Sequence, residues 1–98
     1  MAIVIDGGGI PMAQKITKYA WFMRFYPAEQ SAMIEAAKFD SDIQAVERGF
    51  SYISDLEGVD PKSQGALNAL MLFELKGIIA PGRADVISNT PISPEEAV

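Results

Sequence analysis

The chain has 98 residues, 49% of them apolar and 21% charged, a balance typical of one globular domain rather than of a disordered segment. Neither cysteine nor histidine occurs, which excludes disulfides, thiolate nucleophiles, Cys/His zinc sites and imidazole acid–base chemistry. The net charge of −5 argues against a sequence-independent nucleic-acid binder, because that affinity rests on clustered lysine and arginine.

The first residues predict an extended arm. Three glycines follow a short β-prone run that consists of Ile3, Val4 and Ile5. A single strand of this length is not stable alone, so we expect the arm to add to the sheet of a neighbouring subunit, with the glycines as a flexible joint. A phosphate-binding loop is not indicated, because Lys15 does not stand at the spacing that such a loop requires. We assign residues 1–11 to this arm.

The next segment, Met12–Phe25, contains no helix breaker and repeats its apolar residues at helical spacing. It is unusually aromatic, and its rings gather within eight positions: Tyr19, Trp21, Phe22, Phe25 and Tyr26. A helix with almost no polar side either lies at the centre of the fold or docks onto another chain, and the central position is the commoner one.

Arg24 is the only charged residue inside this aromatic run. In one interpretation, its guanidinium stacks on a ring or pairs with an acid while its aliphatic stem packs against neighbours. In the other interpretation, Arg24 anchors a protein interface, where arginine, tryptophan and tyrosine are enriched. The sequence leaves both interpretations open.

Two more helices are predicted before residue 56. Pro27 suits the first turn of a helix that extends to Ala37 or Phe39. The run Asp40-Ser41-Asp42 is typical of a helix N-cap and predicts a third helix that continues through Phe50. Residues 50–56 could be helical or extended, and the sequence does not decide between the two.

The second half of the chain completes an all-α fold. Asp60 and Pro61 are expected to cap and open a fourth helix, which ends at Gly77. Pro81 is expected to open a short fifth helix, with Arg83 capping carbonyls at the end of the fourth. The predicted architecture is a small bundle of four to five short helices over residues 12–88, with an extended N-terminal arm and an irregular C-terminal tail at 89–98.

The acidic residues supply the remaining candidates for chemistry. Asp40 and Asp42 are explained as helix caps, and the acids around the turn at 55–60 lack the spacing of a calcium-binding loop. Serine has no histidine to activate it, which leaves only an unspecified serine–lysine pair. We therefore expect no catalytic residue, no cofactor site, no metal site and no enzymatic activity. The longest apolar run is too short to span a bilayer, so no membrane association is expected.

Two stretches resemble a known group of proteins. The first contains Ile16-Thr17-Lys18, Ala20-Trp21, Arg24-Phe25 and Ala28-Glu29, and the second consists of Gly77 to Ala84 together with Ile87. Both are similar to small proteins encoded among the tail genes of tailed bacteriophages, and the likeness covers most of residues 15–88. That group carries no assigned biochemical activity, so the resemblance implies a setting, a phage particle or its assembly, rather than a mechanism.

The leading hypothesis is a non-enzymatic phage structural or tail-assembly protein, located in the virion and, during assembly, in the bacterial cytoplasm. As a homo-oligomer or at a fixed place in a larger complex, it would bind other virion proteins through Ile3, Val4, Ile5, Trp21, Phe22, Arg24, Phe25 and Tyr26. The alternative is a small acidic phage effector that binds and inhibits a host protein. A helical DNA-binding regulator comes third, because the second to fourth predicted helices are acidic or apolar rather than basic.

Overall fold

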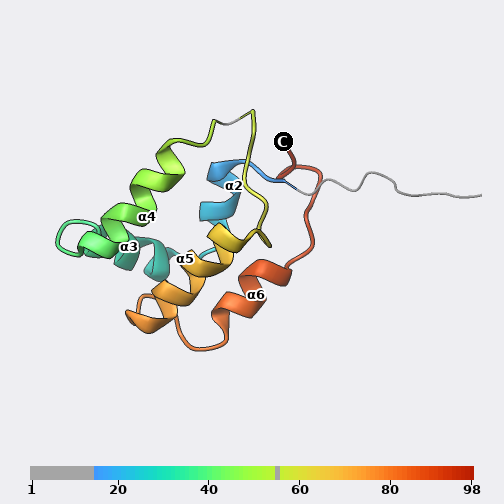
Figure 1. Ribbon diagram of the computed structural model, residues 1–98. Coiled ribbons are helices and arrows are strands. Elements are labelled where there is room, and N and C mark those ends of the chain that lie inside the picture. Colours follow the sequence, from blue (N-terminus) through green and yellow to red (C-terminus); the bar gives the residue numbers. More distant parts are fainter. Residues whose placement is uncertain (1–14, 55) are drawn as a thin grey trace, which may run out of the picture.

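The computed structural model describes residues 15–54 and 56–98, so the predicted arm, with Ile3, Val4 and Ile5, lies outside the described residues. The described residues form five short helices without a named strand, and the all-α prediction is confirmed (Figure 1). The helices are α2 (Lys18–Met23), α3 (Pro27–Ala36), α4 (Ser41–Ser51), α5 (Gln64–Leu75) and α6 (Arg83–Asn89). None of the helices in these ranges is long and apolar enough to cross a membrane.

Helices α3 and α4 begin where local chemistry predicts. Pro27 is the first residue of α3, and its fixed backbone angle suits that position. Asp40 is the N-cap of α4, and its carboxylate accepts hydrogen bonds from the N–H groups of Asp42 and Ile43 at 2.9 and 3.3 Å. Helix α4 ends at Ser51, so residues 52–54 do not continue the helix.

The predicted start of α5 is wrong by three residues. Its N-cap is Ser63, whose hydroxyl accepts a hydrogen bond from the Ala66 N–H at 3.2 Å. Asp60 instead closes a turn, accepting from the Lys62 N–H at 2.9 Å and, through its carbonyl, from the Ser63 N–H at 3.0 Å. Both aspartate and serine are good caps, so local preference alone cannot choose between them.

Helix α2 begins at Lys18, so residues 15–17 of the predicted helix are not helical, while residues 12–14 lie outside the described residues. Thr17 caps it, and the residue before Thr17 is extended because its backbone is paired on both sides. Ile16 forms antiparallel bridges with Val59 and with Ala97, and its N–H donates to the Val59 carbonyl at 2.8 Å. This pairing ties the start of α2 to the turn before α5 and to the C-terminal tail.

The end of α5 is set by a glycine, as predicted. Gly77 follows the C-cap residue Lys76 and has a φ of +76°, in the left-handed region that glycine adopts without strain. The Ile78 N–H then donates back to the Phe73 carbonyl at 2.9 Å. The reversal directs Ile78 and Ile79 into the core, and α6 then runs beside α5 (Figure 1). Helix α6 begins at Arg83, two residues after the predicted start at Pro81.

The core is aromatic and draws on every part of the described chain. The Trp21 ring stacks on Phe50 with centroids 4.7 Å apart, and Phe25 meets it edge-on at 5.0 Å. Phe73 of α5 meets Phe25 edge-on at 5.9 Å. The fully buried side chains around these rings are Ile16, Leu70, Ile79 and Ile87.

Candidate protein-interaction surface

The aromatic helix has two sides in the folded chain. Trp21 and Phe25 are only 5% and 2% exposed and belong to the core. Tyr19 and Met23 lie one turn apart on the opposite side of α2 and are 72% and 52% exposed. Tyr26, just after α2, is 61% exposed. We call Tyr19, Met23 and Tyr26 the α2 stripe.

The α2 stripe rests on a firmly held helix end. The Gln30 side chain of α3 donates to the Phe22 and Phe25 carbonyls, both at 3.2 Å. The Phe22 carbonyl also accepts from the Phe25 N–H at 3.1 Å, so Gln30 adds a second bond there. The same amide lies 3.6 Å from the sulfur of Met23. Because the ring contacts of Trp21 hold the opposite side of α2 in the core, the backbone that carries Tyr19 and Met23 is positioned without a partner.

A buried ion pair holds Tyr26 in place. Arg83 contacts both carboxylate oxygens of Glu29 at 2.8 Å, and its guanidinium carbon lies 3.9 Å from the centroid of the Tyr26 ring. The hydrogen bond from Arg83 is the largest cause that lowers the pKa of Glu29, and the pair raises the pKa of Arg83 in turn. Arg83 was expected to cap carbonyls at the end of the fourth helix, and that prediction is wrong: it faces α3 instead.

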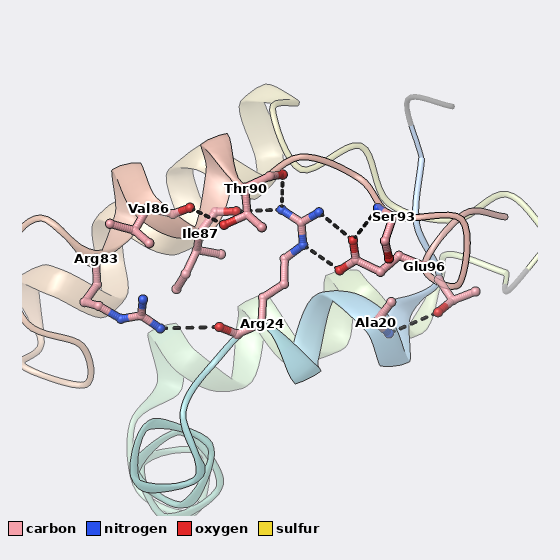
Figure 2. A network of polar contacts seen from close by, with 9 residues as sticks. Ala20, Arg24, Arg83, Val86, Ile87, Thr90, Ser93 and Glu96 are labelled. Carbon is pink, nitrogen blue, oxygen red and sulfur yellow. Dashed lines mark hydrogen bonds and ion pairs between the residues drawn. The ribbon is translucent and has the colours of Figure 1, made fainter. Parts of the chain in front are cut away.

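Arg24 is an internal clamp rather than an exposed anchor. Its side chain is 4% exposed and pairs with Glu96 of the C-terminal tail through two contacts of 3.0 Å. One terminal nitrogen also donates to the carbonyls of Ile87 and Thr90, at 2.8 and 2.9 Å, at the end of α6. Figure 2 shows this guanidinium between α6 and the tail. Of the two interpretations of Arg24, pairing with an acid matches the structure.

The same network joins the two arginines. Figure 2 shows Arg83 reaching back from α6 to the Arg24 carbonyl, which accepts a hydrogen bond from it at 3.3 Å. Burial by itself would raise the pKa of Glu96, but hydrogen bonds from Arg24 and from the Ser93 N–H outweigh burial and lower it. The end of α2 is therefore connected to α3, α6 and the tail by charged contacts that water barely reaches.

Phe22 occupies an intermediate place. It is half-buried and lines an apolar pocket of about 180 Å³ between α2, α3 and α4, together with Ile34 and Phe50. Ile34 is 56% exposed at this pocket. Phe22 therefore contributes a partly exposed apolar surface where α2 borders this pocket.

Two further exposed apolar residues, Phe39 and Leu75, were not singled out from the sequence. Lys76 pairs with Asp40 at 2.9 Å and with Asp42 at 3.1 Å, which brings the end of α5 to the start of α4. Phe39 and Leu75, each 81% exposed, directly precede Asp40 and Lys76 in the chain. The hydrogen bond from Lys76 lowers the pKa of Asp40, and the two aspartates raise the pKa of Lys76. No local signal distinguishes Leu75 from the core residues of its helix, because α5 is apolar on nearly every side.

The chain offers little for metal chemistry in the part that the structure describes. Among residues 15–54 and 56–98, no group of three or more acidic, histidine or cysteine side chains is arranged to hold a metal ion.

The predicted interface residues thus separate into five groups. Trp21 and Phe25 are core, Arg24 is a buried clamp, Phe22 lines a pocket and Tyr26 is exposed, while the arm residues lie outside the described ranges. Tyr19 and Met23 complete the exposed stripe and were absent from the predicted set. No protein-family model, curated protein or solved structure matches the chain.

Proposed function

We propose that the chain is a non-enzymatic structural or tail-assembly protein of a tailed bacteriophage, which binds other subunits of the particle through the α2 stripe and the N-terminal arm. The observation that carries the proposal is the exposed α2 stripe. Tyrosine and methionine are enriched in protein interfaces, and the backbone that carries the stripe does not have to become ordered when a partner binds. The phage setting rests on the resemblance of residues 15–88 to small tail-region proteins.

The test is quantitative mass spectrometry of purified particles from the phage or prophage that encodes this chain. We expect the protein at a fixed stoichiometry to the other virion proteins. Absence from clean particles would overturn the virion proposal. A pull-down from infected cells would then distinguish an assembly chaperone, which captures phage proteins, from an effector, which captures a host protein.

The contribution of the stripe can be measured in the same particles. The double variant Tyr19→Ser, Met23→Ser should lower incorporation by about ten-fold or more, because two interface residues that each cost over about 1 kcal/mol on truncation together exceed one factor of ten. Tyr52→Ser is the matched control, since Tyr52 is 79% exposed but lies at the end of α4. Equal incorporation of the two variants would remove the stripe from the interface.

A further inference from the structure

A second hollow of the molecule lies between α4 and α5. It has a volume of about 730 Å³, within the range of about 300–1,000 Å³ typical of pockets that enclose an organic ligand. Its apolar lining comes from α4, from the segment that follows it and from α5, and includes Val46, Phe50, Ile53, Ala69 and Leu72. Several of these side chains are only partly buried, so the groove exposes apolar surface that nothing in the described chain covers.

Lys15 lines the same groove. This residue is where the described chain begins, so the segment of residues 1–14, which includes the arm, is joined to the described chain at the rim of the groove. The arm carries the apolar run Ile3, Val4 and Ile5. Contact between this run and the groove would remove apolar surface of both from water, which is favourable. Asp6 follows that run directly, and its charge is opposite to that of Lys15 on the rim.

From these observations we infer that in the free subunit residues Ile3–Ile5 of the chain's own arm dock in the groove between α4 and α5. The inference does not depend on the phage setting. The docked residues would cover the apolar groove before any partner is present.

The connecting segment is long enough for this docking. Residues 6–14 span at most about 30 Å when fully extended, at about 3.3 Å per residue. The groove follows α5 from Ser63 to Leu72, which is about 14 Å along the axis at 1.5 Å per residue. Gly7, Gly8 and Gly9 allow the chain to reverse direction toward the groove.

The covalent connection through residues 6–14 also favours the chain's own arm over the arm of a second copy as the occupant of the groove. A short covalent linker of this kind gives a tethered segment an effective concentration of about a millimolar at a site on the same chain. A second copy at micromolar concentration competes poorly with that value. The intramolecular arrangement is therefore favoured in dilute solution.

The test uses the absence of cysteine from the natural chain, so that an introduced pair is the only thiol pair present. The variant Val4→Cys, Asn68→Cys places one thiol on the arm and one on an exposed α5 residue that lines the groove. The control Val4→Cys, Met71→Cys uses the same helix, because Met71 is 65% exposed but does not line the groove. Far-UV circular dichroism of the purified proteins checks that both variants retain their helices.

We expect the Asn68→Cys variant to form an intramolecular disulfide about ten times faster than the Met71→Cys variant in a glutathione buffer, since a disulfide needs Cα atoms within about 7 Å. Intact mass and non-reducing electrophoresis measure the product. Adding Ile3→Ser and Ile5→Ser to the Asn68→Cys variant should reduce its rate to that of the control.

Three results would overturn the inference. Equal rates for the two pairs would show that the arm samples the surface without preference. A disulfide between two molecules in place of the intramolecular one would assign the groove to the arm of a second copy. An undiminished rate after the two serine substitutions would show that apolar docking does not hold the arm. The assay uses the free protein, so its result is independent of whether the protein enters a particle.

Discussion

At the scale of single residues, Arg24 connects three parts of the fold: the end of α2, the end of α6 and the C-terminal tail. It joins the end of α2 to the end of α6 and to Glu96, which lies 72 positions away in the sequence. Such a distance explains why the sequence leaves its role open: nothing local marks Glu96 as the partner. A bidentate pair with a 4% exposed guanidinium stabilises the fold only while both partners are present.

Arg24→Met should therefore lower the free energy of unfolding by about 3 kcal/mol, because it leaves the Glu96 carboxylate without its partner. Urea unfolding followed by Trp21 fluorescence measures the change. The control is Lys38→Met, whose pair with Glu35 is 3.5 Å long and exposed, and which should cost less than about 0.5 kcal/mol. Similar losses for the two variants would contradict the clamp.

The lowered carboxyl pKa values predict how stability depends on pH. Glu29 and Glu96 have pKa values below the ordinary 4.5, so the unfolded chain takes up protons at these sites before the folded chain does. Their stabilisation is complete above about pH 4.5 and is lost as the pH falls through the lower folded values. Urea unfolding at about pH 6 and about pH 3 should show this loss, and Arg83→Met should reduce it. An unchanged pH dependence in that variant would contradict the role of the Arg83–Glu29 pair.

At the scale of elements, local chemistry predicts a helix boundary well where nothing distant competes with it. Pro27 and Asp40 mark the starts of α3 and α4, and both are confirmed. The start of α5 is displaced because Val59 is paired with Ile16, which keeps the chain extended and inserts a turn before the helix. The same pairing delays α2. A contact between residues more than forty positions apart leaves no periodic signal in either segment.

Gly58, which belongs to this paired region, predicts a strong effect of a small substitution. Its φ of +73° is left-handed, and an added Cβ would meet the Val98 side chain and come within 2.7 Å of the Ile16 carbonyl oxygen. Gly58→Ala should cost about 3 kcal/mol in the free energy of unfolding, from backbone strain plus overpacking.

Two other glycines are its controls in the same denaturation experiment. Gly77 is also left-handed but has open space around it, so Gly77→Ala should cost only about 1–2 kcal/mol. Gly49 lies within α4 in open space, and Gly49→Ala should stabilise by about 1 kcal/mol. A Gly58→Ala loss no larger than that of Gly77→Ala would show that the tail yields to the added methyl group.

At the scale of the whole molecule, the sequence predicts the class of fold but not which side of the aromatic helix faces outward. All-α architecture follows from periodicity and caps, which are local. Trp21 faces inward because it contacts Phe50 and Phe73, which come from distant parts of the chain. The sequence does not show where those two rings lie, so it cannot tell whether Trp21 or Tyr19 is the buried residue. Glu29 and Arg83, 54 positions apart, were missed as a pair for the same reason.

The pairing of Ile16 with Ala97 has a mechanical consequence. The Val98 N–H donates to the Lys15 carbonyl at 3.2 Å and the Thr17 N–H to the Glu96 carbonyl at 3.0 Å, so the two ends of the described chain leave the molecule at one point. A force that pulls these ends apart would open the bonds one after the other, starting at Val98. The Arg24–Glu96 pair would bear the load next, and the helices would be loaded only after that pair had parted. A tension applied at Lys15 would thus break these terminal hydrogen bonds before it reached the core.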